Sequence, residues 1–519
     1  MAGVELNPVV TNVESLAVSM QGITKIFGSI KANDGIDFSL KQGSIHGLLG
    51  ENGAGKTTLM NVLYGLYQQD AGQIAVYGTK VDINSPLKAI SLGIGMVHQH
   101  FMLARPLTVV ENVMLGRKSR SRPLLDTKET AQELKDLSDK YGMGVDPYSK
   151  IWQLSVGEQQ RVEILTALYM GANILILDEP TAVLTPQETS VFFDTLRQMR
   201  DDGKSIVLIT HKLEEIIAIV DEVTVLRDGR MIGTKPVDKD VTKDDLTRMM
   251  VGRDVLFDFE ENTRVPGGVR YSLHNLSARN NKGVLSLKHF SLDLREGEIV
   301  GLAGVDGNGQ NELCEVLSGL RLADEGEVRL DGAPMTNKPP VSYISGGVSY
   351  IPEDRHTTGL AMNWSLKLNL ILKSFGSAPF SRHGLLRQSV IEKHWEQTRK
   401  AYQIKSGSGN DAAKSLSGGN QQKVILAREI ESSPKVLIAN QPTRGLDVGA
   451  AEYVRRKLLN ASNNGTAVLV VSADLEEILQ LSDRIAVIYG GELMGILGRG
   501  ADPYQIGELM MGKRLENSC

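Results

Sequence analysis

The chain has 519 residues, of which 41% are hydrophobic and 23% charged, and its formal net charge is −5. This is the composition of an ordinary globular protein, and the small negative charge gives no electrostatic reason to expect a nucleic-acid-binding protein. The two cysteines are too few for a disulfide scaffold. We expect Cys314 to be a core thiol and assign no chemistry to Cys519. Because the sequence has no long apolar run and no signal-peptide pattern, we expect a soluble cytosolic protein that meets a membrane only through partners.

The first motif in the chain is GENGAGKTT, between an apolar strand pattern and an amphipathic helix pattern. Its glycines let the backbone curl so that N–H groups point at phosphate oxygens, and the helix N-terminus adds a favourable dipole. Lys56 can reach the β and γ phosphates, and the Thr57 hydroxyl can ligate Mg²⁺. The pattern predicts an ATP-binding loop formed by Gly50, Glu51, Asn52, Gly53, Ala54, Gly55, Lys56, Thr57 and Thr58.

Polar residues at the ends of three later apolar strands could complete this site. Asp178 ends the strand ILILD and is placed to hold Mg²⁺, and Glu179 can accept a proton from attacking water. His211 ends another strand and could contact the γ phosphate, while Gln99 ends MVHQ and could sense Mg²⁺ and water. Taken alone, His211 and Gln99 could equally be structural residues.

Every one of these motifs has a counterpart in the second half of the chain. GVDGNGQNE begins at Gly304, 254 residues after Gly50, and LSGGNQQ begins at Leu416, 262 residues after the LSVGEQQ that starts at Leu154. Internal similarity at a fixed offset indicates a tandem duplication. We therefore expect two domains, 1–252 and 271–519, joined by a connector at 253–270. The segment between MVHQ or YIPE and the LS-x-G motif should be mostly helical in each half.

The second copy keeps the frame of the site but loses its charged and metal-binding groups. The replacements are Gln310 for Lys56, Asn311 for Thr57, Glu353 for Gln99, Asn440 and Gln441 for Asp178 and Glu179, and Ala473 for His211. Amides preserve shape and hydrogen bonding, but they neither accept a proton nor bind Mg²⁺ strongly. The sequence therefore predicts one site that hydrolyses ATP and one that does not.

The phosphate loop, Gln99, LS-x-G-x-Q, ILILDEP and His211, in this order, resemble the ATP-binding cassette family over nearly the whole chain. The resemblance implies an α/β fold of two cassettes. Each would have a RecA-like P-loop core, an antiparallel β subdomain and an inserted helical subdomain. It also implies that the cassettes pack head to tail, with ATP between the phosphate loop of one and the LS-x-G segment of the other.

This resemblance also assigns residues to the two composite sites. Phe27 resembles the aromatic residue that stacks on adenine, although a core position is the alternative. The second half would complete the hydrolytic site, with its cofactors ATP and Mg²⁺, through Ser417, Gly418, Gly419, Gln421 and Asp447. The degenerate site would comprise Gly304, Gly307, Gly309, Gln310, Asn311, Glu353, Asn440, Gln441 and Ala473, with Ser155 and Gly157 from the first half.

Three functions are open to a tandem cassette: transport, translation and DNA repair. Translation relatives usually have two intact sites and a long charged linker, and repair relatives carry zinc-binding cysteine clusters, so transport is favoured. TAVLTPQE and PTRGLDVGA resemble bacterial importers of monosaccharides and nucleosides. GMVHQHFMLARPLTVVENVMLG and LSVGEQQRVEIL are most similar to the nucleoside branch, and a ribose-, galactose- or xylose-type importer is the alternative.

An importer of this kind implies a set of partners. These are two transmembrane permease subunits and an extracytoplasmic solute-binding protein or lipoprotein, with no nucleic acid, and the chain would lie at the cytoplasmic face of the membrane. We expect the permease contacts at His100 to Pro106 and Asp354 to Gly359, because both follow the strand that ends in Gln99 or Glu353. The basic stretch Gly116 to Arg122 is expected to be a solvated loop.

Overall fold

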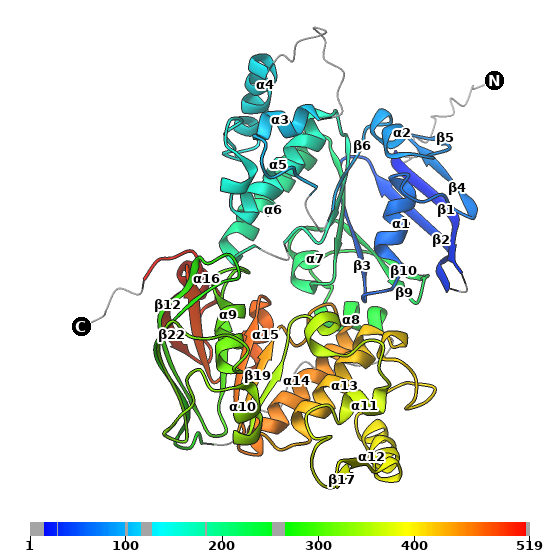
Figure 1. The fold of residues 1–519 in the computed structure, drawn as a ribbon. Coiled ribbons are helices and arrows are strands. Elements are labelled where there is room, and N and C mark those ends of the chain that lie inside the picture. Colours follow the sequence, from blue (N-terminus) through cyan, green and yellow to red (C-terminus); the bar gives the residue numbers. More distant parts are fainter. Residues whose placement is uncertain are drawn as a thin grey trace, which may run out of the picture. The chain divides into compact units, whose positions relative to one another are not determined.

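The structure is a computed structural model, and it describes residues 15–28, 30–98, 102–115, 127–181, 184–251 and 265–514. The chain divides into two compact units (Figure 1). One comprises Met1–Thr181 and Glu188–Val255, and the other comprises Leu256–Cys519 and the short segment Ala182–Gln187. Among the described residues, no helix combines the length and apolar character needed to cross a bilayer.

The first unit is built on two sheets. The larger has the order β10-β9-β3-β8-β7-β6, in which all neighbours are parallel except β10, which pairs antiparallel with β9 at one edge. The smaller is an antiparallel sheet with the order β2-β1-β4-β5. The strands are β1 Leu16–Phe27, β2 Ile30–Lys41, β3 Ile45–Gly50, β4 Ala71–Val76, β5 Thr79–Val81, β6 Ile94–Val97, β7 Ile174–Asp178, β8 Ser205–Thr210, β9 Glu222–Arg227 and β10 Arg230–Pro236.

Helices pack against the larger sheet, and the helices that lie between β6 and β7 in the sequence form a separate small core. Val110 and Val113 of α3 pack with Ala131 and Leu134 of α4 in this core, apart from the core under the sheets. The predicted helical insertion between MVHQ and LS-x-G is thus present. The helices are α1 Lys56–Leu63, α2 Pro86–Ser91, α3 Val109–Met114, α4 Thr127–Lys140, η1 Ile151–Gln153, α5 Val156–Tyr169, α6 Pro186–Asp201, α7 Leu213–Ile219 and α8 Lys243–Val251.

The second unit repeats this architecture. Its main sheet has the order β16-β19-β20-β13-β21-β22, its antiparallel sheet has the order β12-β11-β14-β15, and β17 and β18 form a two-stranded hairpin. The strands are β11 Val269–Arg279, β12 Leu285–Arg295, β13 Ile299–Ala303, β14 Glu325–Leu330, β15 Ala333–Pro334, β16 Val348–Ile351, β17 Ser381–Arg382, β18 Leu385–Leu386, β19 Val436–Asn440, β20 Ala467–Ser472, β21 Arg484–Tyr489 and β22 Glu492–Gly498. The helices are α9 Gln310–Leu317, α10 Pro340–Gly346, η2 Arg355–Gly359, α11 Leu366–Leu370, α12 Gln388–Ala401, η3 Ala413–Ser415, α13 Gly418–Ile430, α14 Val448–Asn463, α15 Leu475–Leu481 and α16 Pro503–Met510.

The parallel strands account for the position of the site residues. All five residues of β7 and of β19 are buried, as expected for central strands covered on both faces. The carboxyl ends of β3, β7 and β8 lie at the same edge of the sheet, which is where α/β proteins place their ligands. Cys314, on α9, is fully buried as predicted, and burial raises the pKa of its thiol.

Candidate nucleotide-binding sites

The predicted phosphate loop of the first unit connects β3 to α1. Gly53 and Gly55 have φ angles of 85° and 97°, in the left-handed region that favours glycine, and Gly55 caps the helix. A Cβ on Gly55 would lie 2.3 Å from the Ala32 carbonyl oxygen, and one on Gly50 would lie 2.4 Å from that of Leu226. Larger side chains are therefore excluded at both positions. Glu51, Asn52 and Ala54 lie in the same loop, and Thr58 in the first turn of α1.

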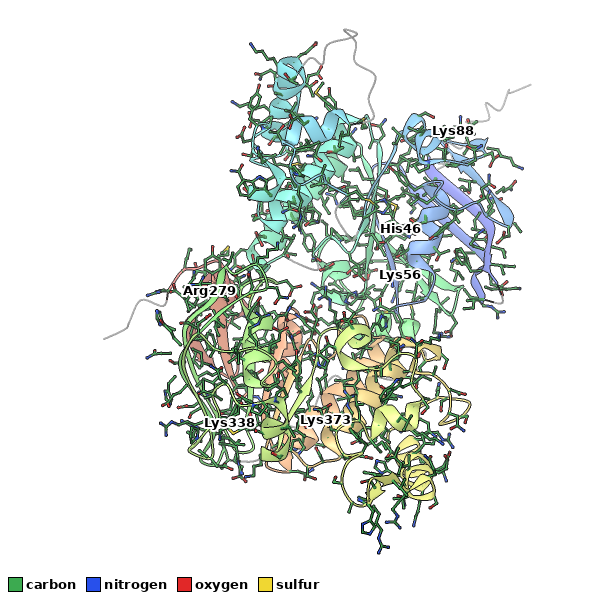
Figure 2. All side chains as sticks on the ribbon, in the orientation of Figure 1. His46, Lys56, Lys88, Arg279, Lys338 and Lys373 are labelled. Atoms are coloured by element: carbon green, nitrogen blue, oxygen red, sulfur yellow. The ribbon has the colours of Figure 1, made fainter. Side chains whose placement is uncertain are left out.

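Lys56, labelled in Figure 2, is the first residue of α1 and directly follows this loop. Its side chain is almost completely buried, and Nζ donates to the carbonyl oxygens of Gly50 at 2.6 Å and Glu51 at 3.0 Å. Burial lowers the pKa of Lys56, while the nearby carboxylates of Glu179, Asp178 and Glu51 act in the opposite direction. The loop thus supplies a confined cation with hydrogen-bonding partners that phosphate oxygens could replace.

Thr57 and Asp178 meet at the carboxyl end of β7. Thr57 Oγ1 donates to Asp178 Oδ2 at 3.1 Å, and burial raises the pKa of Asp178 to about 6 although this hydrogen bond acts against the shift. Hydroxyl and carboxylate oxygens are ligands that Mg²⁺ accepts. Within the described residues no group of three or more His, Cys, Asp or Glu side chains could hold a metal alone. A magnesium ion here would therefore depend on phosphate oxygens and water, as is usual for Mg²⁺ beside a nucleotide.

Glu179 and His211 are brought together by neighbouring strands. His211 Nδ1 lies 2.8 Å from Glu179 Oε1, and the Glu179 N–H donates to the Ile209 carbonyl at 2.9 Å. Burial raises the pKa of Glu179, but the His211 hydrogen bond and the charges of His211, Lys56 and Lys212 outweigh it, so the pKa lies below its usual range. Glu179 is thus a carboxylate at neutral pH, the form that can accept a proton.

Two further predicted residues have different outcomes. Phe27 is 41% exposed, and its ring lies edge-on to that of Tyr67 at 5.2 Å, so the alternative of a core aromatic is excluded. Its adenine-stacking role stays a prediction. Gln99 lies outside the described residues, and so do His100, the basic stretch Gly116 to Arg122, Cys519 and most of the connector.

The counterpart loop in the second unit has the same backbone but a neutral side chain across it. Gly307 and Gly309 have φ angles of 91° and 101°, and Gly309 caps α9. Gln310 Nε2 donates to the Val305 carbonyl at 2.9 Å, and its Oε1 accepts the Asn308 N–H at the same distance. The Gln310 side chain therefore uses one of the loop N–H groups itself. A Cβ on Gly304 would lie 2.7 Å from Ile488 Cγ2.

Amide side chains stand in the second unit at the positions of Thr57 and Asp178. Asn440 Nδ2 donates to Asn311 Oδ1 at 2.7 Å, and Asn311 Nδ2 donates to Glu353 Oε2 at 2.9 Å. Gln441 Nε2 donates to Asp306 at 3.3 Å, and its Oε1 accepts the Ala473 N–H at 3.2 Å. Asn440 and Asn311 thus hydrogen-bond each other at the positions of Asp178 and Thr57.

Sequence reasoning missed a cation in this network. The Arg444 guanidinium pairs with Glu353 and lies 3.8 Å from Asp306. The first copy has Ala182 at the position of Arg444 and Gln99 at that of Glu353. A paired gain of opposite charges was therefore visible by aligning the two halves. In the second unit the positive charge of Arg444 thus compensates the negative charges of Glu353 and Asp306.

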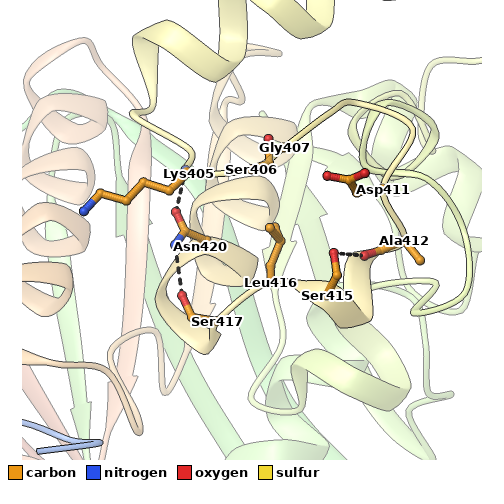
Figure 3. A pocket seen from close by; sticks show the side chains of 9 residues that line it. All are labelled: Lys405, Ser406, Gly407, Asp411, Ala412, Ser415, Leu416, Ser417 and Asn420. Carbon is orange, nitrogen blue, oxygen red and sulfur yellow. Dashed lines mark hydrogen bonds between the residues drawn. The ribbon is translucent and has the colours of Figure 1, made fainter. Parts of the chain in front are cut away.

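The LSGGNQQ segment of the second unit begins helix α13. Ser417 is at the N-cap position without a side-chain capping hydrogen bond to the backbone, and its hydroxyl accepts a hydrogen bond from Asn420 Nδ2 at 2.9 Å. Figure 3 shows Ser417 and Asn420 on the wall of a cavity of about 660 Å³. Gln421 is 4% exposed and donates to the Leu416 carbonyl at 3.2 Å, so in this unit it supports the turn from inside.

The remaining predicted residues of this segment lie beside Ser417. The Gly418 carbonyl accepts from Arg355 at 3.2 Å, and a Cβ on Gly419 would lie 3.3 Å from Ala450 Cβ. Asp447 caps α14 by accepting the Ala450 N–H at 2.7 Å. The start of α13 thus lies close to α14, and a side chain at Gly419 would be in tight contact with Ala450.

The first-unit segment LSVGEQQ is capped in another way. Ser155 Oγ accepts the Glu158 N–H at 3.3 Å, while Glu158 Oε2 accepts the Ser155 N–H at 2.7 Å, which is a capping box. Gly157 lies in the first turn of this helix, α5. Glu158 therefore places a carboxylate at the helix N-terminus, where α13 has the neutral Asn420.

Two glycine-rich loops between a parallel strand and a helix, one with lysine, threonine and acidic strand ends beside it, define a P-loop nucleotide-binding protein. The family model described as ABC transporter matches residues 33–182 and 287–444. The chain belongs to the ABC transporter family and contains two of its ATP-binding cassettes, as predicted. It is an ABC-type ATPase coupled to transport.

Relatives match almost the full length. The chain is 46% identical over 526 residues to the glucose import ATP-binding protein TsgD13 of Haloferax volcanii, covering 95% of both chains. It is 46% identical to the nucleoside import ATP-binding protein NupA of Lactococcus lactis subsp. cremoris, covering 95% of this chain and 98% of NupA. It is 47% identical to the guanosine import ATP-binding protein NupO of Bacillus subtilis, covering 95% of this chain and 97% of NupO.

Proposed function

We propose that this chain powers the import of nucleosides and that it does so with one hydrolytic and one degenerate ATP site. The single observation that carries the asymmetry is the contrast between Glu179 and Gln441. Both have a left-handed backbone, with φ of 48° and 49°, at the same point after a buried strand. Only Glu179 can accept a proton from water.

The first-unit residues have separate roles in this proposal. The loop N–H groups and Lys56 bind the phosphates, while Thr57 and Asp178 hold Mg²⁺, which when bound neutralises phosphate charge. Glu179 orients the attacking water and accepts its proton, and His211 fixes the Glu179 carboxylate through their 2.8 Å contact. We assign the sensing role to Gln99 from sequence alone. Phe27 offers an exposed face to the adenine.

The composite arrangement is also part of the proposal. Ser417, Gly418, Gly419 and Asp447 of the second half would close over the nucleotide held by Lys56, while Gln421 supports their turn from within. Ser155 and Gly157 would face the degenerate loop. The Ser417 hydroxyl accepts a hydrogen bond from the Asn420 side-chain amide, and the first turn of α13 contains no acidic residue. The absence of a negative charge in this turn supports a role facing phosphate.

Two permeases and a solute-binding protein or lipoprotein would complete the importer, with the chain at the cytoplasmic face of the membrane. On the second half, the expected permease contact contains exposed Asp354, His356 and Thr357. His356 Nε2 lies 3.1 Å from Gln421 Oε1, and Arg355 donates to the Gly418 carbonyl. A permease segment docked here would therefore contact residues that themselves hydrogen-bond to Gly418 and Gln421 of the LSGGNQQ segment. This direct link supports coupling between ATP and transport at this loop.

Nucleosides are the proposed solute class because the motif resemblance agrees with the names of two relatives, NupA and NupO. The glucose importer relative, at similar identity, keeps monosaccharides as the second candidate. The test is uptake and ATPase stimulation in vesicles that contain the chain, its permeases and its binding protein. Stimulation by purine or pyrimidine nucleosides is expected, and stimulation by monosaccharides alone would replace the proposal with the second candidate.

A further inference from the structure

A buried glutamate lies directly behind the proposed catalytic pair and belongs to none of the nucleotide-binding motifs. Glu215, on the first turn of α7, is 4% exposed. Its Oε2 accepts a hydrogen bond from the Thr210 hydroxyl at 2.8 Å, and its Oε1 accepts one from the Thr181 hydroxyl. One carboxylate therefore joins the last residue of β8 to the loop that follows β7.

Both threonines are close in sequence to the catalytic pair. Thr181 follows Glu179 by two residues, and Thr210 immediately precedes His211. Lys212 reinforces the connection, because its Nζ lies 3.3 Å from the Thr181 carbonyl oxygen and 3.6 Å from Glu215 Oε1. The Lys212 N–H also donates to Thr210 Oγ1 at 3.0 Å. The loops that carry Glu179 and His211 are thus tied to one anchor.

The anchor matters because the backbone at Glu179 is strained. A non-glycine residue at a φ of 48° has an unfavourable conformation, which persists only where surrounding contacts determine it. A buried carboxylate is itself costly unless it is hydrogen-bonded, so an apolar side chain would be the simpler filling for this position. We propose that Glu215 is a positioning residue for ATP hydrolysis, which holds Glu179 and His211 in register through Thr181 and Thr210. This inference rests on the proposed catalytic role of Glu179.

The second unit contains a matched residue with no catalytic pair to position. Glu477 follows Glu215 by 262 residues, is fully buried and lies next to Ser472 and Thr443. The groups at the catalytic positions are Gln441 and Ala473. Glu477 is also 3.7 Å from Arg455, whose counterpart in the first unit is Phe193. Substitution of Glu477 is therefore a control for the loss of a buried carboxylate without loss of catalytic alignment.

The experiment compares Glu215→Gln and Glu477→Gln in the full chain assembled with its permeases. Because small displacements of a reacting group can cost up to about 100-fold, Glu215→Gln should lower kcat at least about 10-fold while KM for ATP and ATP affinity stay within about 2-fold. Glu477→Gln should leave kcat within about 2-fold. Thr210→Val, which removes one hydroxyl donor at nearly constant volume, should give an intermediate loss and serves if Glu215→Gln does not fold.

A second measurement separates positioning from stability. In a Glu179→Gln background, Glu215→Gln should add little further loss, because it acts through Glu179. A normal kcat in both Glu215→Gln and Thr210→Val would overturn the inference. Equal losses in Glu215→Gln and Glu477→Gln, or losses of ATP affinity that match those of kcat, would also overturn it. If Glu179→Gln itself hydrolyses ATP normally, the proposed function fails instead.

Discussion

The two phosphate loops of this chain have nearly the same backbone but differ in the charged and polar side chains around them. Their capping glycines have φ of 97° and 101°. In each loop one buried side chain, Lys56 or Gln310, donates hydrogen bonds to carbonyl oxygens of the loop backbone. In the first unit the cation of Lys56 lies near the carboxylates of Asp178 and Glu179. In the second, amides bond to one another and Arg444 supplies the positive charge. Backbone conformation is thus set by glycines and packing, whereas the capacity for turnover depends on a few side chains that can change without altering the loop.

The largest expected effect comes from substituting the proposed catalytic base, Glu179. Glu179→Gln makes the first site resemble Gln441, and loss of the base should lower the ATPase rate by about 10²- to 10⁴-fold. ATP binding should persist, because the loop and Lys56 are intact. Steady-state ATPase assays and nucleotide-binding titrations on the assembled transporter measure the two effects. A near-normal rate would contradict the role of Glu179.

A second comparison concerns the two LS-x-G serines. Ser417→Arg places a bulky cation where we propose that the γ phosphate of the hydrolytic site is covered, so the ATPase rate should fall by about 10²-fold through misplacement. Ser155→Arg, facing the degenerate loop, should reduce it less. Both variants are assayed in the same transporter. Equal rates, or inactivity of Ser155→Arg alone, would show that the head-to-tail pairing is wrong.

The loop side chains provide a third contrast. Lys56→Ala removes a buried cation, and because hydrogen bonds to charged groups contribute about 1.5–3 kcal/mol, ATP affinity at the first site should fall about 10- to 100-fold. Gln310→Ala should leave that affinity unchanged. Titration with a fluorescent ATP analogue distinguishes them. If Lys56→Ala binds as tightly as the unmodified protein, the phosphate-loop role of Lys56 is excluded.

Asp178 can carry a buried negative charge and Asn440 cannot, and this difference should change the free energy of unfolding. The folded-state pKa of Asp178, raised to about 6, exceeds the unfolded value, so its ionised form destabilises the metal-free fold above pH 6 and this penalty vanishes below about pH 4. Asp178→Asn should therefore raise the unfolding free energy by about 1–3 kcal/mol at pH 7.5, with the gain shrinking as the pH falls. Asn440→Asp should destabilise at pH 7.5. Thermal unfolding without nucleotide and with a Mg²⁺ chelator measures both, and a pH-independent gain would show that the buried charge of Asp178 is not its cause.

The smallest expected effect comes from restoring a glutamate at position 441 in the second unit. Gln441→Glu in a Glu179→Gln background should recover almost no ATPase activity, because the second unit still has Gln310, Asn440 and Ala473. Groups that act as a unit are strongly non-additive. ATPase assays of the double variant in the assembled transporter test this. Substantial recovery would mean that the second site is far more complete than its hydrogen bonds indicate.

The parts of the fold and site that local chemistry determines were predictable from sequence. A buried strand followed by glycines at fixed spacing and Lys56 leaves few alternatives, and the duplication placed the second loop by comparison. The hairpin β17–β18 was not predicted, because two strands of two residues each have no alternation to detect. Phe27 was ambiguous because aromatic residues occur both in cores and at ligand faces.

Longer-range contacts were missed for a different reason. Glu215 belongs to the stretch LEEI, which by its pattern is an acidic first turn of a helix, and nothing local indicates that its carboxylate reaches two threonines. Arg444 likewise pairs with a residue 91 positions away. Such partners depend on how strands and loops meet in space, and a single sequence shows them only where a second copy within the chain reveals which charges change together.

The carbonyl contacts of Lys56 have a consequence for how strongly this loop can bind a phosphate group. A buried ammonium group without hydrogen-bonding partners would have a high free energy, and any phosphate oxygen that paired with it would relieve that cost in full. Because Gly50 and Glu51 accept hydrogen bonds from Nζ, a phosphate oxygen that reached Nζ would replace a carbonyl partner rather than meet an unpaired ammonium group. Part of the gross attraction between Lys56 and a phosphate oxygen is thereby offset, so the net contribution of this lysine to affinity is smaller than its charge and burial alone would suggest.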